Sequence, residues 1–161
     1  MTAPATTVDL TRHHLIRRLL LLDLDPDDFV IFGSGPLLAH GLRYHIGDLD
    51  VVARGAAWRR VEQIGVPTVG PLNGALMYHF YGGLIEVSRE WVSRDWSADE
   101  LIDGADVICG LRFARLEHVL TYKEALRRSK DVADLKVLRR YLDARGRGPV
   151  RRARMELAPV G

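Results

Sequence analysis

Short apolar runs bounded by turn residues alternate with helical patterns along this chain, and that alternation most constrains its fold. Phe29–Phe32 is an apolar run closed by Gly33-Ser34-Gly35-Pro36, as expected for a buried strand that enters a tight turn. Two strand-like runs between Met77 and Ser88 flank Gly82-Gly83, a two-residue hairpin signal. Antiparallel pairing within a helix–strand order predicts an α/β (α+β) fold, with a mixed central β-sheet packed by helices.

The other elements follow from the same periodicities. Strands are expected at Asp48–Ala53 and around Val107–Phe113, and helices at Leu10–Leu22, Leu37–Leu42, Ala56–Ile64, Leu116–Arg127 and Lys130–Leu142. A length of 161 residues, 47% of them hydrophobic, suits one compact domain. We expect this domain at 1–144, with its core at 28–142. A basic tail is expected at 145–161, where the arginines are Arg145, Arg147, Arg151, Arg152 and Arg154.

Several classes of protein do not fit the sequence. No apolar run approaches the length of about 18 residues that a membrane span needs, and Met1–Thr11 lacks the pattern of a secretory signal. The single cysteine, Cys109, excludes an internal disulfide, and its apolar neighbours predict a buried side chain. A net charge of +2 is too small to indicate nucleic-acid binding by itself. We therefore expect a cytoplasmic protein without a membrane partner.

Three carboxylates stand at strand positions where they can converge. The period of two in Asp48-Leu49-Asp50 puts Asp48 and Asp50 on one side of their strand, and Glu86 faces away from Ile85 and Val87. Like charges this close repel unless a cation lies between them. Mg²⁺ is the natural cation, because it takes one or two protein carboxylates and completes its shell with water and phosphate oxygens. A two-metal site is possible with Glu86 as a third ligand.

The turn upstream has the properties of a phosphate-binding loop. Gly33 lets the backbone approach phosphate, Ser34 offers a hydroxyl and an amide, and a helix beginning near Pro36 directs its positive end at an anion. A phosphate cradle would then lie beside the predicted metal site.

These motifs resemble those of the DNA polymerase beta nucleotidyltransferase superfamily. Its signature is a Gly-Ser or Gly-Gly turn followed by an Asp-x-Asp strand, here Gly33-Ser34 and Asp48-Leu49-Asp50-Val51, with Glu86 at the third carboxylate. The run Leu120–Leu126 and the run Ser129–Leu135 are similar to the closing helices of small bacterial members of the abortive-infection, toxin-antitoxin and antibiotic-modifying types. The resemblance covers residues 28–142 and implies the nucleotidyltransferase fold.

The resemblance also implies an activity. A magnesium-dependent transferase would move a nucleoside monophosphate from a nucleoside triphosphate to a small molecule, tRNA or protein, and release pyrophosphate. Asp48, Asp50 and Glu86 would be both catalytic and metal-binding, while Gly33, Ser34, Lys123 and Lys130 would bind the nucleotide.

Two of the helical residues have alternative interpretations. Lys123 lies within the apolar stripe of its helix, so its ammonium either meets phosphate or extends outward to solvent. Asp131 is interpreted mainly as complementing the dipole of the last helix, with Ser129 as N-cap, rather than as an active-site residue. The aromatic residues Tyr78, Phe80 and Tyr81 are interpreted as packing residues rather than as a base-stacking surface.

Two other functions remain open. The first is a binding or regulatory module that has kept the fold without catalysis, for example as half of a toxin-antitoxin pair. The second is an RNA-, DNA- or protein-binding function led by the arginine-rich tail. Three converging carboxylates favour the enzyme, because a site without catalysis has no physical reason to keep them uncompensated.

Overall fold

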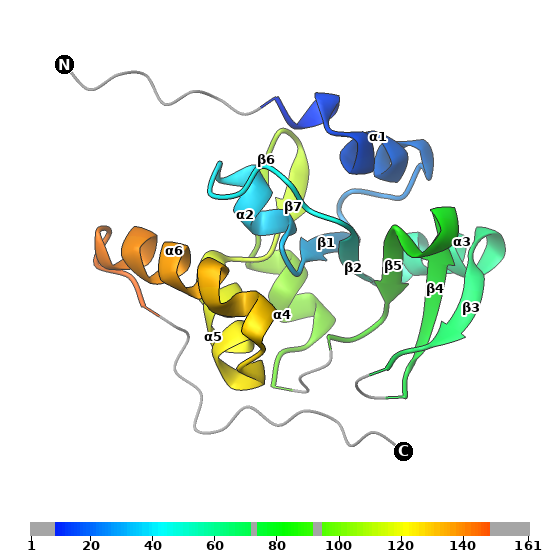
Figure 1. Ribbon diagram of the computed structural model, residues 1–161. Helices are drawn as coiled ribbons and strands as arrows, with labels where there is room; N and C mark the ends of the chain where they lie inside the picture. The colour runs from blue at the N-terminus through cyan, green and yellow to red at the C-terminus, as the bar shows by residue number, and fades with distance from the viewer. Residues whose placement is uncertain (1–8, 72–73, 92–94, 149–161) are drawn as a thin grey trace.

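The computed structural model describes residues 9–71, 74–91 and 95–148, and seven strands within them form one mixed sheet (Figure 1). The strands are β1 Phe29–Phe32, β2 Leu49–Ala53, β3 Val66–Val69, β4 Leu76–Phe80, β5 Ile85–Ser88, β6 Asp106–Ile108 and β7 Leu111–Phe113, in the spatial order β3-β4-β5-β2-β1-β7-β6. The pairs β2–β5 and β1–β7 are parallel and the others are antiparallel. The predicted mixed sheet is confirmed.

Helices pack on both faces of this sheet. They are α1 His14–Leu21, α2 Gly35–Ala39, α3 Gly55–Ile64, α4 Ala98–Asp103, α5 Leu116–Leu126 and α6 Val132–Asp143, with short 3-10 turns at Leu10–Arg12, Tyr81–Gly83 and Ser129–Asp131. None of the helices in the described part of the chain is long and apolar enough to span a membrane.

Two hydrophobic cores lie on opposite faces of the sheet. One packs Leu49, Val51 and Ile85 against α1 and α3, and the other packs Phe32 and Val52 against α4, α5 and α6. The alternation of strand side chains therefore directs Leu49 and Val51 to the first face and their neighbour Asp50 to the second. Helices cover the second face at β1 and at Val52 of β2, whereas Asp50 of β2 and parts of β5 and β4 line the cavity described below.

Several predicted boundaries differ from the structure at points where a side chain caps or breaks a helix. The helix predicted at Leu10–Leu22 is two elements, because His13 is extended and its ring Nδ1 accepts the Leu15 amide at 3.2 Å. The short helix predicted at Leu37–Leu42 lies at Gly35–Ala39 instead, with Pro36 in its first turn.

Both predicted hairpin regions also need correction. The loop between β4 and β5 is not the two-residue turn Gly82-Gly83, because it begins at Tyr81 and includes a 3-10 turn. The single strand predicted around Val107–Phe113 is the hairpin β6–β7, which turns at Cys109 and Gly110 with φ values of 52° and 75°. Cys109 is exposed there, so the prediction that it is buried was wrong.

The last helix begins later than predicted. It starts at Val132 rather than Lys130, and Ser129 is not its N-cap. Asp131 occupies the N-cap position but makes no side-chain cap hydrogen bond, because its carboxylate binds Lys123 and Arg128 instead. Part of the predicted tail lies against the domain, since Arg147 binds Glu117 of α5 and the Arg145 guanidinium lies 3.5 Å from the centre of the Tyr141 ring. Arg151, Arg152 and Arg154 lie outside the described residues.

Candidate active site

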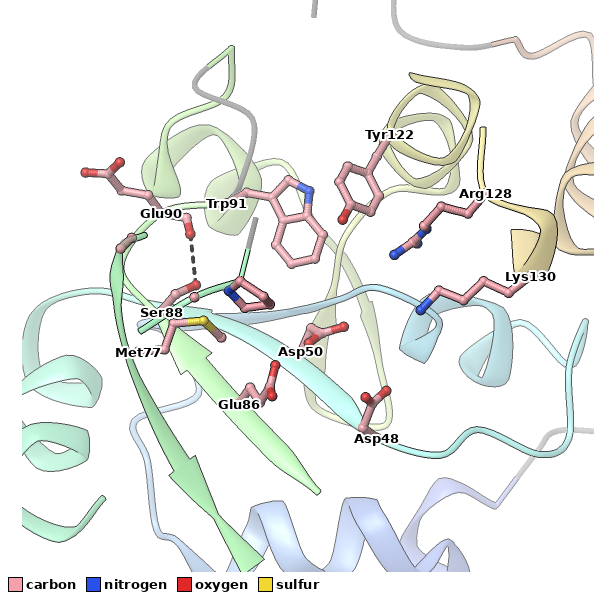
Figure 2. Close-up of a pocket in the computed structure, with 13 residues that line it drawn as sticks. Asp48, Asp50, Met77, Glu86, Ser88, Glu90, Trp91, Tyr122, Arg128 and Lys130 are labelled. Atoms are coloured by element: carbon pink, nitrogen blue, oxygen red, sulfur yellow. Dashed lines mark hydrogen bonds between the residues drawn. The ribbon is translucent and has the colours of Figure 1, made fainter. Parts of the chain in front are cut away.

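The three predicted carboxylates line one cavity on the open face of the sheet (Figure 2). Asp50 of β2 and Glu86 of β5 are register partners across a parallel pair, and Asp48 immediately precedes β2. The cavity has a volume of about 350 Å³. Because Leu49, Ile85 and Val87 point into the core beneath, the strand period leaves all three carboxylates on the cavity side.

Asp50 has the most perturbed acidity of the three. Burial, together with the charges of Asp48 and Glu86, raises the pKa of Asp50 from 3.8 to about 7, although Lys123 and Lys130 act in the opposite direction. Among the described residues neither Asp48 nor Asp50 has an ion-pair partner. Within the described residues, no ion pair therefore balances the charge of these two carboxylates.

Gly33 and Ser34 form the wall of an adjoining cavity of about 180 Å³. Gly33 has a φ of 63°, and a Cβ at that position would lie 2.5 Å from Oδ2 of Asp50. The glycine is thus needed both for its backbone conformation and for the close approach of Asp50. Ser34 Oγ accepts hydrogen bonds from Arg43 at 3.2 Å and Lys123 at 3.5 Å, so its own proton can be donated to a ligand.

A buried ionic network lies behind this second cavity. Lys123 is 3% exposed, and its Nζ lies 2.9 Å from Asp131 Oδ1 and 3.1 Å from Asp134 Oδ2. Arg128 also binds Asp131, with Nε 2.6 Å from Oδ2, and Arg43 binds Asp134 at 3.0 Å. Positive and negative groups alternate through the network, which joins α5, α6 and the chain after α2.

The network corrects two interpretations made from the sequence. The Lys123 head does not extend to solvent, because its ammonium donates hydrogen bonds to Asp131 and Ser34 and forms an ion pair with Asp134. Asp131 does more than complement a helix dipole, because it binds two cations and lines the smaller cavity. Although burial alone raises the pKa of Asp131, hydrogen bonds from Arg128 and Lys123 lower it below its ordinary value. Lys130 is exposed and lines both cavities.

Aromatic side chains form the wall opposite the carboxylates. Trp91 and Tyr122 line the larger cavity, and the sequence interpretation did not single them out for a site. The hairpin aromatics pack elsewhere, as predicted: Tyr78 meets the edge of Trp58, and the Tyr81 hydroxyl donates to the Arg18 carbonyl at 3.0 Å. Burial raises the pKa of Tyr122, so it is a neutral phenol at physiological pH.

His79 is a second residue that the sequence interpretation left unassigned. It is the register partner of Glu86 across the β4–β5 pair, and its Nε2 lies 3.4 Å from Glu86 Oε1. Strand register is the signal that could have found it, because a hairpin places one residue of β4 directly opposite Glu86.

The donor set suits Mg²⁺ in its chemistry but is not a preassembled cage. Within residues 9–71, 74–91 and 95–148, no group of three His, Cys, Asp or Glu side chains already has metal-binding proximity. Mg²⁺ does not require one, since it is commonly held by one or two carboxylates together with water and substrate phosphates. Asp48 and Asp50 provide such a pair at the junction of the two cavities.

Comparisons with known proteins assign no family to the chain. No protein-family model matches it, and no curated protein matches it significantly. Among solved structures, the crystal structure of JHP933 from Helicobacter pylori aligns with a TM-score of 0.48 and 22% identity, over 81% of this chain and 65% of JHP933. The chain thus spans about two thirds of that protein. A likeness at this level carries no argument about activity, so the function is inferred from the site.

Proposed function

We propose that this protein is a magnesium-dependent nucleotidyltransferase, which transfers a nucleoside monophosphate from a nucleoside triphosphate to an acceptor and releases pyrophosphate. One observation carries the proposal: Asp48, Asp50 and Glu86 line one cavity, which joins a second cavity walled by Gly33, Ser34 and cations. Carboxylates at the reacting phosphate and cations at the leaving phosphates are what this reaction requires.

The charged side chains indicate which part of the nucleotide each cavity would bind. Gly33 and Ser34 offer a backbone amide and a hydroxyl to the terminal phosphates, and Arg43, Arg128 and Lys130 line the same space. Asp48 and Asp50 line both cavities, so the α-phosphate belongs at their junction. Mg²⁺ held by these two carboxylates, when bound, draws charge from the phosphate oxygens.

Glu86 is positioned for the acceptor. It lines only the larger cavity, and Figure 2 shows it apart from Arg128 and Lys130. In an in-line displacement the acceptor oxygen forms a bond to the α-phosphorus as the bond to the bridging oxygen of pyrophosphate breaks. Glu86 accepts the acceptor proton in this scheme, and His79 fixes the orientation of the carboxylate from β4.

Lys123 acts through other residues. Its contacts with Asp131, Asp134 and Ser34 hold the Ser34 hydroxyl against the smaller cavity. We therefore give Lys123 a positioning role and assign direct phosphate contact to Lys130, which is exposed at the junction.

A labelling experiment tests the activity. Purified protein is incubated with each α-labelled nucleoside triphosphate, Mg²⁺ and a cell extract, and transfer of label to any small molecule, RNA or protein is followed. Asp50→Asn is the matched control, because it keeps size and shape while removing one carboxylate charge. We expect the variant to transfer label about two to three orders of magnitude more slowly than the parent.

The same assay separates this proposal from a binding module. Nucleotide that binds and raises the melting temperature without labelling any acceptor would indicate a binding or regulatory domain. Equal labelling by the parent and by Asp50→Asn would show that Asp50 is not part of the mechanism.

A further inference from the structure

The two cavities of the cleft have walls of different chemistry. The smaller one is bounded by the Gly33-Ser34 turn and by cations. The larger one adds Pro71, Ala75, Met77 and Trp91, which the smaller one lacks, while Tyr122, Arg128 and Lys130 line both. Phosphates suit the first set of walls, and an uncharged planar ring suits the second. Asp48 and Asp50 mark the boundary, since they line both cavities.

This inference rests on the proposed function. With the terminal phosphates against the Gly33-Ser34 turn and the α-phosphate at Asp50, the nucleoside extends into the larger cavity. We propose that this cavity is the subsite for the nucleobase, bounded by Met77 and Trp91, and that it favours a base with an exocyclic amino group.

Trp91 is a rigid stacking surface. Its ring stacks on Phe32 with centroids 4.0 Å apart and an interplanar angle of 17°, and it meets the edge of Tyr122 at 4.8 Å. These contacts fix the indole before a ligand arrives, so little conformational entropy is lost when a base binds. Stacking on such a surface is favourable for any base, because every base has a π face.

Met77 forms the sheet side of the same space. It is the register partner of Ser88 across the β4–β5 pair, and both residues line the cavity. Figure 2 shows Met77 on the strand and Trp91 on the other side of the cavity. A thioether is polarisable and adapts to a flat ring, which suits a base lying between these two side chains.

The polar groups at this end accept hydrogen bonds. Ser88 Oγ donates its proton to the Glu90 carbonyl at 2.8 Å, so its lone pairs remain for a ligand. Glu90 adds a carboxylate acceptor to the same cavity, while the indole nitrogen of Trp91 is on the side of Tyr122 (Figure 2). Cytosine and adenine present amino donors to such acceptors, whereas uracil presents a carbonyl at the position of the cytosine amino group.

Calorimetry with matched ligands tests the subsite. The probes are the magnesium complexes of CTP, UTP and tripolyphosphate, the last of which has the phosphates without a nucleoside. We expect CTP to bind roughly tenfold more tightly than UTP, because one charge-assisted hydrogen bond differs between them. Both nucleotides should bind more tightly than tripolyphosphate.

Two neighbouring residues of β4 provide a matched pair of variants. Met77→Ala removes part of the wall and should weaken CTP binding roughly two- to tenfold while leaving tripolyphosphate binding unchanged. Leu76→Ala is the control, because Leu76 is 52% exposed and does not line the cavity. Melting curves establish that both variants are folded.

The outcomes separate this inference from the proposed function. Equal affinities for CTP and UTP, or a Met77→Ala effect equal on CTP and tripolyphosphate, would overturn the base subsite while leaving phosphate binding in place. Failure of all three ligands to bind would overturn the proposed function, and the subsite with it.

Discussion

Two carboxylates that line the smaller cavity, Asp50 and Asp131, differ in how their charge is balanced. Asp131 is 1% exposed, yet hydrogen bonds from Arg128 and Lys123 keep its pKa below the ordinary value. Asp50 has Asp48 and Glu86 as close charged neighbours, and its pKa is raised to about 7. Burial raises the pKa of both residues; the charges of Asp48 and Glu86 add to this effect at Asp50, whereas hydrogen bonds from Arg128 and Lys123 reverse it at Asp131.

The comparison separates a network of balanced charges from a cluster of unbalanced ones. The network around Lys123 is complete within the protein, since each of its carboxylates has a cation at hydrogen-bond distance. The cluster around Asp50 lacks such pairing at Asp48 and Asp50 within the described residues, and under the proposed function Mg²⁺ would balance it. Like charges held close together raise the free energy of the folded state.

The largest expected effect on stability comes from breaking the complete network. Asp131→Asn removes its central negative charge and leaves Lys123 with one carboxylate, so the free energy of unfolding should fall by about 3 kcal/mol. Denaturant titration measures this change. Asp143→Asn, on the exposed side of the same helix, should alter it by less than about 0.5 kcal/mol. Similar effects of both variants would remove the distinction between the two clusters.

The second prediction concerns a lysine at the junction of the two cavities and its effect on ligand affinity. Lys130→Ala should weaken the binding of magnesium tripolyphosphate roughly tenfold, because one charge-assisted contact is lost. Lys136→Ala is the control: Lys136 is an exposed lysine of α6 that lines neither cavity of the cleft. Calorimetry on both variants gives the comparison, and equal losses would indicate a general effect of net charge.

The third prediction concerns the pH dependence of the stability of Asp50→Asn without metal. Because the folded-state pKa of Asp50 is raised from 3.8 to about 7, its ionisation costs the folded state increasingly as pH rises between these values. The variant should therefore melt a few degrees above the parent at pH 8 in EDTA. At pH 4 the two proteins should melt alike, since Asp50 is then largely protonated in the folded parent.

A variant that melts below the parent at pH 8 would contradict this expectation. Asp50 would then make a structural contact like those of Asp131, and the two carboxylates would no longer be of different kinds.

The sequence predicted those parts of the fold that local chemistry determines. β1 matches its predicted residues, because an apolar run followed by glycine and proline allows few alternatives. β3 went unpredicted, since it is a four-residue edge strand that contains Pro67. α4 was also not predicted, although the spacing Ser-x-x-Glu is typical of a helix N-terminus. In the structure, Ser97 Oγ accepts a hydrogen bond from the Glu100 amide at 3.1 Å.

Of the candidate site, only the residues that belong to strands could be predicted from the sequence. The period of two placed Asp48 and Asp50 on one side of their strand and turned Glu86 away from Ile85 and Val87, and the family resemblance suggested that the three meet. Trp91 and Tyr122 enter from the chain after β5 and from α5, so their place in the cavity depends on how the helices dock. The partners of Lys123 were hidden for the same reason, because Asp134 lies on a different helix.

The turn at Cys109 makes the protein convenient to label. Its thiol is exposed between β6 and β7, it is the single cysteine of the sequence, and it lines neither cavity of the cleft. A maleimide fluorophore would therefore attach at one defined position, and each molecule would carry one dye. Fluorescence anisotropy of that dye would report the binding of a large acceptor without any modification of the cleft itself.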